Sequence, residues 1–132
     1  DPEAQVVLPL LKSSLFDMML SSIDGDLENH EIEIEDKFAV TVVLAAKGYP
    51  NSYNKGMLID GLEHFQNDIL FHAGTKYEDE KYYSIGGRVL NVVGKDDNLK
   101  SAINKAYNNV NKIDFIDKYY RTDIGTKGLK TQ

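Results

Sequence analysis

The sequence predicts an α+β domain, in which short antiparallel strands form a meander or a small barrel-like sheet and one amphipathic helix follows. Three observations lead to this prediction. The run from Phe38 to Ala46 is apolar, rich in β-branched residues and without an alternating polar face, as in a strand covered on both faces. Shorter alternating segments follow it between polar turns. From residue 99 to residue 113, apolar residues recur at steps of four and three, the period of a helix.

The composition excludes several classes of function. At 132 residues the chain fits one domain, which buries roughly two thirds of its unfolded surface. Without cysteine, neither a disulfide framework nor a thiolate metal site can form. A net charge of −6 argues against a nucleic-acid or anionic-membrane surface, since both need a basic patch. No apolar run approaches the roughly 20 residues that span a bilayer, and no charged-then-apolar leader is present, so we expect a cytoplasmic protein.

The first thirty residues are predicted to be mainly helical. Pro9 suits the first turn of a short helix, where its missing N–H costs nothing. Ser14, with Asp17 three residues later, predicts the start of a clearer amphipathic helix that ends at Gly25. In residues 31–35, glutamate and isoleucine alternate, which predicts a half-buried edge strand with the glutamates in solvent.

Short strands are expected through the middle of the chain. Residues 57–62 and 69–73 alternate in polarity, and a hairpin is predicted to turn at Glu78, Asp79 and Glu80. An apolar strand follows Arg88. Asp96 or Asp97 is then expected to cap the long helix. After it, residues 119–125 are expected to form a short ordered return, and residues 126–132 a frayed tail.

Two of the predicted strands, the apolar run 38–46 and the apolar strand that follows Arg88, are flanked by residues that suit a ligand site. Lys47 and Gly48 follow the first of them, and Gly87 directly precedes Arg88 at the start of the second. If these strands are antiparallel neighbours, the two cations lie at the same end. Arg88 would then offer a fork of parallel donors to a phosphate, and Lys47 a point charge. The alternative is that both are solvent-facing cations whose stems cover strand ends.

Other reactive residue types indicate less. The three histidines have no metal-site spacing, and His72 is expected to be a hydrogen-bonded sheet residue. The pairs Tyr82–Tyr83 and Tyr119–Tyr120 would face opposite ways on a strand, so we expect them to pack rather than to form a stacking platform. We assign no catalytic residue and no metal ligand within this chain.

Five phrases carry a resemblance to a known family: AVTVVLAAKGYP, KGMLIDGLE, FHAGTK, GGRVLNVVG and YYRTDIG. In this order and spacing they resemble the C-terminal part of the phosphoribosylamine-glycine ligase family, also called glycinamide ribonucleotide synthetases. The resemblance covers nearly the whole chain. It implies an ATP-dependent ligase of de novo purine biosynthesis, which joins glycine to 5-phosphoribosylamine to form glycinamide ribonucleotide. In enzymes of this type, ATP phosphorylates the glycine carboxylate, and the sugar amine attacks the resulting acyl phosphate.

The resemblance also implies roles for residues at the two strand ends. Lys47 and Arg88 are expected to face the 5-phosphate of phosphoribosylamine, and Gly48, Gly87 and Asn91 to shape that wall of the substrate-binding site. The protein would act mainly by positioning its substrates and neutralising their charge.

The resemblance divides the chain into residues 1–30, the helical end of an ATP-grasp domain, and residues 31–132, a β-rich C-terminal domain. Asp1-Pro2-Glu3 resembles the end of a motif whose earlier part binds magnesium. ATP and Mg²⁺ (or Mn²⁺) would therefore bind mostly through the N-terminal, ATP-grasp portion of the enzyme, which is this chain's expected partner. This chain alone is expected to be inactive. The alternative is a free-standing β-rich binding module with the same fold and no ligase activity.

Overall fold

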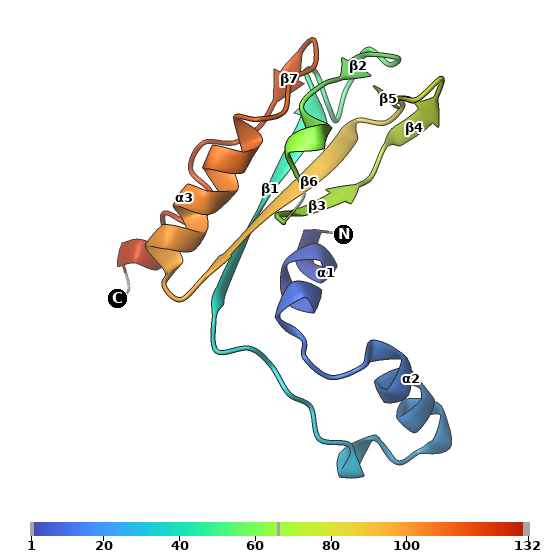
Figure 1. The fold of residues 1–132 in the computed structure, drawn as a ribbon, viewed down its shortest axis with the longest axis vertical. Helices are drawn as coiled ribbons and strands as arrows, with labels where there is room; N and C mark the ends of the chain where they lie inside the picture. Colours follow the sequence, from blue (N-terminus) through green and yellow to red (C-terminus); the bar gives the residue numbers. More distant parts are fainter. Residues whose placement is uncertain (1, 66, 131–132) are drawn as a thin grey trace.

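The computed structural model describes residues 2–65 and 67–130, which form two antiparallel sheets and a small set of helices (Figure 1). A four-stranded sheet has the order β3-β6-β1-β7, and a three-stranded sheet has the order β2-β5-β4. The strands are β1 (Phe38–Ala46), β2 (Leu58–Ile59), β3 (Ile69–His72), β4 (Thr75–Glu78), β5 (Lys81–Ser84), β6 (Arg88–Asp96) and β7 (Lys118–Tyr119). The predicted α+β class is confirmed, but the strands form two open sheets rather than one meander or barrel.

Three α-helices and four short 3₁₀ helices complete the part of the chain that is described. They are α1 (Pro2–Val7), η1 (Leu8–Leu10), α2 (Leu15–Asp24), η2 (Leu27–Asn29), η3 (Leu62–His64), α3 (Leu99–Val110) and η4 (Gly128–Lys130). None of the helices described is long and apolar enough to cross a membrane.

The core lies between α3 and one face of the β1–β6 pair. The two strands are antiparallel, from Phe38 opposite Asp96 to Ala45 opposite Arg88. Alternate residues of β1 (Val40, Val42, Leu44) are buried and belong to the same core cluster as the apolar stripe of α3. Burying these side chains stabilises the fold by roughly 1.5–3 kcal/mol each.

Helix α3 packs unusually close to β6 because the contact residues are small. A Cβ at Gly94 would lie 2.1 Å from the carbonyl oxygen of Ala102 on α3. The N-cap lies one or two residues later than predicted. It is Asn98, whose Oδ1 accepts a hydrogen bond from the Ser101 N–H at 2.9 Å, and not Asp96 or Asp97. Asn98 has the extended backbone that an N-cap needs.

The opposite face of β1 is less covered than its apolar sequence predicted. Thr41 and Val43 on this face are only half-buried. The reason is that, among the described residues, no large helix covers them. The six-residue α1 lies against β1 and β6 instead. This incompletely covered face carries the cavities of the candidate functional site.

The smaller sheet contains the predicted hairpin. Asp79 and Glu80 both have positive φ, as a two-residue hairpin turn requires, and place Tyr77 opposite Tyr82 with ring centroids 4.7 Å apart. His72 contacts Thr75 through Nδ1 at 2.9 Å, which confirms it as a hydrogen-bonded sheet residue. The strand expected over residues 57–62 is shorter, because only Leu58–Ile59 pairs with β5.

Helix α2 lies away from both sheets, on the segment between α1 and β1, which is here called the arm (Figure 1). Its predicted ends are confirmed: Ser14 Oγ accepts a hydrogen bond from the Asp17 N–H at 3.3 Å, and Gly25 ends the helix with φ +73°. The edge strand predicted at residues 31–35 is wrong, because pairing there is limited to one bridge between Leu11 and Ile34, and Ile34 is 61% exposed. No described element packs on this segment to bury its isoleucines.

The arm is attached to the large sheet through Lys95. Its Nζ donates to the Pro9 carbonyl at 3.1 Å and to Glu35 Oε1 at 2.7 Å, so one β6 side chain holds both the outgoing and the returning segment. The hydrogen bond from Lys95 lowers the pKa of the Glu35 carboxyl.

The C-terminal segment is more ordered than predicted. The ordered return is confirmed, since β7 places Tyr119 opposite Ala45 of β1. The tail was expected to fray from residue 126, but residues 126–130 form turns and η4, which contacts α3. Residues 131–132 of that predicted tail lie outside the described residues.

Candidate functional site

The paired strands β1 and β6 bring the two glycine-flanked cations to the same end of the sheet. Ala45 is opposite Arg88, and the Ala46 N–H donates to the Gly87 carbonyl at 2.8 Å. Lys47 follows directly, with its own N–H donating to Asp117 O at 2.9 Å. The strand adjacency that the phosphate hypothesis requires is therefore present.

The turn after β1 carries Tyr49 back over the start of β6. Gly48 has φ +98°, and a Cβ there would lie 2.2 Å from Ser52 O, so only glycine fits. The Tyr49–Pro50 peptide bond is cis. A Cβ at Gly87 would lie 2.1 Å from the ring of Tyr49, so the ring rests directly on the Gly87 backbone.

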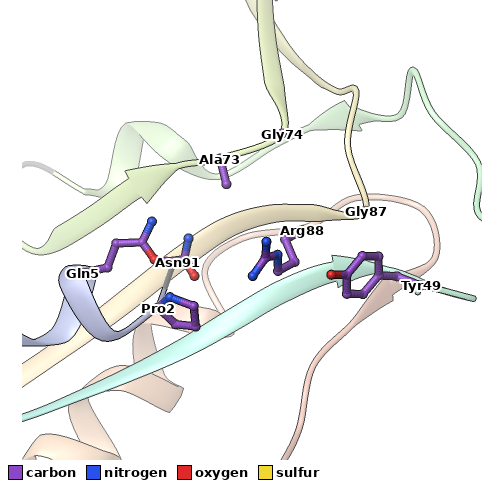
Figure 2. A pocket seen from close by; sticks show the side chains of 8 residues that line it. All are labelled: Pro2, Gln5, Tyr49, Ala73, Gly74, Gly87, Arg88 and Asn91. Carbon is purple, nitrogen blue, oxygen red and sulfur yellow. The ribbon is translucent and has the colours of Figure 1, made fainter.

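A pocket of about 340 Å³, here called the polar pocket, opens beside this contact (Figure 2). Arg88 and Asn91 of β6 face into it, and the amide of Gln5 on α1 lies next to that of Asn91. The Tyr49 hydroxyl is turned toward Arg88 in the same view. The described lining residues are Pro2, Gln5, Tyr49, Ala73, Gly74, Gly87, Arg88 and Asn91.

Gly74, which lines the polar pocket, is in close contact with Gly86 behind it. The Gly74 N–H donates to Arg88 O at 2.9 Å, and a Cβ at Gly74 would lie 2.5 Å from the Cα of Gly86. Because neither residue has a side chain, the chain after β3 lies flush against the start of β6. This contact fixes the backbone from which the Arg88 side chain extends.

Three of the five predicted site residues line the polar pocket, namely Gly87, Arg88 and Asn91. Gly48 is not in the lining, but it forms the turn that positions Tyr49. Lys47 is exposed and lines neither of the two cavities on this face.

Sequence reasoning missed the other five lining residues, Pro2, Gln5, Tyr49, Ala73 and Gly74. The tyrosine and Gly74 lie in the phrases AKGYP and FHAGTK, so a signal for them was present. Gln5 had no local signal, because only the tertiary fold returns α1 to this face.

A second cavity of about 310 Å³, here called the apolar cavity, shares Pro2, Tyr49 and Arg88 with the polar pocket. Its lining is otherwise mostly aliphatic and aromatic: Thr41, Val43, Ala45, Tyr119, Tyr120, Arg121 and Ile124. One wall comes from the face of β1 that α1 leaves partly open, and the other from residues 119–124.

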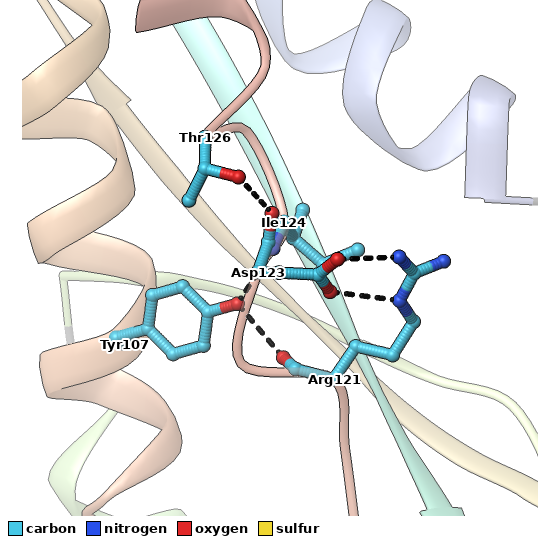
Figure 3. A network of polar contacts seen from close by, with 5 residues as sticks. All are labelled: Tyr107, Arg121, Asp123, Ile124 and Thr126. Carbon is cyan, nitrogen blue, oxygen red and sulfur yellow. Dashed lines mark hydrogen bonds and ion pairs between the residues drawn. The ribbon is translucent and has the colours of Figure 1, made fainter.

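A polar network holds that second wall against α3 (Figure 3). The Tyr107 hydroxyl donates to Arg121 O at 2.7 Å and accepts from the Ile124 N–H at 3.1 Å.

The Arg121 guanidinium binds both carboxylate oxygens of Asp123, at 2.9 and 2.7 Å. This hydrogen bonding lowers the pKa of Asp123 and raises that of Arg121. Thr126 Oγ1 donates to Asp123 O at 2.8 Å and completes the network.

The groups that line the polar pocket are hydrogen-bond donors and acceptors. Its described lining offers a guanidinium, two amides and a phenol, and it contains no carboxylate, histidine, serine or threonine. Among residues 2–65 and 67–130, no three His, Asp or Glu side chains gather as a metal site would need. An arginine with neutral donors suits an anionic, hydroxyl-bearing ligand such as a sugar phosphate.

Fold and pocket together define a small α+β domain whose polar pocket is lined by Arg88 and by the amides of Gln5 and Asn91. The chain belongs to the phosphoribosylglycinamide synthetase family, because the model described as "Phosphoribosylglycinamide synthetase, C domain" matches residues 39–127. The matched range includes Arg88, Asn91 and all of the large sheet except Phe38, the first residue of β1.

Similar proteins agree with this membership. The chain is 52% identical to a phosphoribosylamine–glycine ligase of Fusobacterium nucleatum, over 96% of this chain and 30% of the relative. It is 46% identical to a bifunctional purine biosynthetic protein of Pichia angusta, over 98% of this chain and 17% of that protein. A crystal structure of phosphoribosylamine–glycine ligase from Thermotoga maritima superposes with a TM-score of 0.74 at 32% identity, covering 93% of this chain and 30% of that one. The chain thus spans about 30% of the single-function ligases that it resembles, as their C-terminal portion.

Proposed function

We propose that this chain is the C-terminal part of an ATP-dependent ligase that joins glycine to 5-phosphoribosylamine to form glycinamide ribonucleotide. The observation that carries the proposal is the polar pocket, in which Arg88 meets the amides of Asn91 and Gln5 at the glycine-rich end of β6. The names of the relatives and the family match support the same reaction. They also favour the ligase over a free-standing binding module, since the relatives with this domain carry it within longer enzymes.

In this proposal, Arg88 binds the 5-phosphate of phosphoribosylamine. A guanidinium presents parallel N–H donors that match two phosphate oxygens. Asn91 is only 3% exposed and lines the pocket, and its amide can both donate to and accept from a sugar hydroxyl beside the phosphate. Lys47, exposed on the same strand end, adds a flexible positive charge outside the pocket. The domain would thus hold the sugar phosphate so that its amine has a constant position.

ATP and Mg²⁺ or Mn²⁺ do not fit the residues described here. The polar pocket has no carboxylate in its described lining, and a glycine-rich phosphate loop is absent from the sequence. We therefore derive no step through ATP or metal from this chain. Their ligands are proposed to lie in the ATP-grasp portion of the enzyme, which is also this chain's partner.

We also propose that residues 1–30 end the ATP-grasp domain and that residues 31–132 form the C-terminal domain. The exposure of α2 supports this division. Phe16 is 72% exposed and Ile23 is 81% exposed, although both are large apolar side chains of one amphipathic helix. A helix with such a face normally packs against another element. The upstream portion of the enzyme is the partner we propose for it.

The test of the proposed function is substitution of Arg88 in the intact ligase. Loss of a charge-assisted hydrogen-bonded contact costs about 1.5–3 kcal/mol, so Arg88→Ala should raise the KM for phosphoribosylamine roughly 10- to 150-fold. The KM values for glycine and ATP should change little. Arg88→Lys should recover only part of the loss, because lysine cannot bind two oxygens in the same fork.

The matched control is Lys76→Ala, which removes an exposed cation of β4 that lines neither the polar pocket nor the apolar cavity. Its kinetics should equal those of the parent. An Arg88→Ala enzyme whose KM for phosphoribosylamine is unchanged would show that the phosphate is bound elsewhere.

A further inference from the structure

The substrates of the proposed reaction leave the apolar cavity unexplained. Its described lining is dominated by three tyrosines, aliphatic side chains and Pro2, with Arg88 and Arg121 as the charged members. Glycine carries no side chain, and the ring of phosphoribosylamine is a hydroxylated sugar, so neither substrate offers an aromatic ring or an apolar chain to such a surface. A cavity of this composition is typical of sites that take an apolar or aromatic group.

The apolar cavity and the polar pocket meet at Arg88. Both are lined by Pro2, Tyr49 and Arg88, so one ligand with an anionic end and a planar ring could occupy the two together. Their volumes, about 340 and 310 Å³, are each within the range of small-molecule sites. The charge distribution favours a ligand whose anionic group lies at the junction and whose ring extends toward Tyr119 and Tyr120.

We propose that the apolar cavity takes the purine ring of a nucleoside 5′-monophosphate, whose phosphate lies at Arg88 in the polar pocket. This inference rests on the proposed function. A nucleoside 5′-monophosphate contains the same 5-phosphoribosyl group as phosphoribosylamine and carries a ring system at C1 in place of the amine. A site that recognises this group next to a tyrosine-lined cavity therefore binds both molecules, and they compete. The two fused rings of a purine offer the larger planar surface for stacking.

The cavity wall is held in place before any ligand binds. Strand β7 pairs with β1, and the Tyr107 hydroxyl joins Arg121 O to the Ile124 N–H on the next turn of the same wall. The backbone that carries these tyrosines therefore needs little ordering on binding, which favours affinity. Tyr119 is 54% exposed, so it can be replaced with little effect on folding.

The experiment measures inhibition of the intact ligase by AMP and by ribose 5-phosphate, the same group without a base. AMP should compete with phosphoribosylamine, and should bind at least about fivefold more tightly than ribose 5-phosphate, as expected for one stacked base. Tyr119→Ala should remove this advantage and leave both the ribose 5-phosphate affinity and the KM for phosphoribosylamine unchanged. Tyr77→Ala is the matched control, because Tyr77 is 60% exposed on β4 and lines neither cavity.

A second variant fills the cavity instead of opening it. Val43→Phe, on the β1 wall, should weaken AMP at least fivefold without weakening ribose 5-phosphate. The inference is overturned if AMP binds no more tightly than ribose 5-phosphate, if AMP competes with ATP alone, or if neither variant changes its affinity. In those cases Arg88→Ala should still weaken the binding of ribose 5-phosphate if the proposed function is right. If Arg88→Ala also left the binding of ribose 5-phosphate unchanged, the proposed function itself would be refuted.

Discussion

Replacing Gly87 by alanine should damage the site much more than the fold. A Cβ at this position would lie 2.1 Å from Tyr49 Cδ2, so the ring must move by more than about 1 Å to reach ordinary van der Waals contact. Tyr49 is 39% exposed and can swing into solvent, so the cost in stability should be below about 1 kcal/mol. Its ring lines both the polar pocket and the apolar cavity, however, and a displacement of about 1 Å near a site can reduce catalysis up to 100-fold.

The assay compares Gly87→Ala with Gly94→Ala in the intact ligase. A Cβ at Gly94 would lie 2.1 Å from the Ala102 carbonyl oxygen and 2.5 Å from the Ala106 nitrogen, and a helix backbone cannot swing aside. Gly94→Ala should therefore cost about 1–3 kcal/mol or more, and lower the melting temperature by about 2–4 °C for each kcal/mol. Gly87→Ala should melt near the parent but raise the KM for phosphoribosylamine at least about tenfold. If Gly87→Ala instead lost stability and kept its KM, the reasoning about Tyr49 would be refuted.

Two further predictions concern the arm and the pH dependence of stability. The double substitution Phe16→Ser with Ile23→Ser should leave the melting temperature of the 132-residue chain unchanged. It should destabilise the intact ligase by about 1.5–3 kcal/mol per side chain, because we expect these residues to be buried there. If the intact parent and the variant melted at the same temperature, the proposed packing of α2 would be contradicted. Burial lowers the pKa of His72 below its ordinary value of 6.5. As the pH falls, His72 therefore takes up a proton in the unfolded chain before it does so in the folded one. The free energy of unfolding should decrease from about pH 7 down to the lowered pKa. Denaturation midpoints at about pH 7.5 and about pH 5.5 measure this decrease, and His72→Gln should make it smaller; an equal decrease in parent and variant would assign it to other groups.

Much of the local structure could be predicted from short-range patterns. The ends of α2 at Ser14 and Gly25 depend on capping groups within three residues, and both were confirmed. The hairpin at Asp79 and Glu80 was likewise predictable from the polar turn between two alternating segments. Predictions failed where a segment's environment decides its structure: residues 31–35 have a strand pattern, but no neighbouring strand pairs with them beyond one bridge at Ile34.

The candidate site was predictable in part. Gly87 directly precedes β6, and Arg88 and Asn91 belong to this strand, so the three are close in the sequence. On a regular strand Arg88 and Asn91 would face opposite sides, but the pairing with β1 shifts its register between Arg88 and Leu90. Gln5 and Tyr49 reach the same pocket from other segments, and their arrival depends on how α1 and the turn after β1 pack on the sheet. The apolar cavity could not be foreseen, since its walls come from β1 and from residues 119–124, which lie far apart in the sequence.

By itself, the sequence determined the class of the fold, most element positions and the family, because these depend on periodicity, capping and the order of short phrases. Only the tertiary structure decided that β1 pairs with β6, that the strands divide into two sheets and that Tyr49 rests on Gly87. These features come from contacts between distant segments, whose free energy is a sum over many buried pairs and is not encoded in any one stretch. The two cavities that meet at Arg88 are a product of that packing.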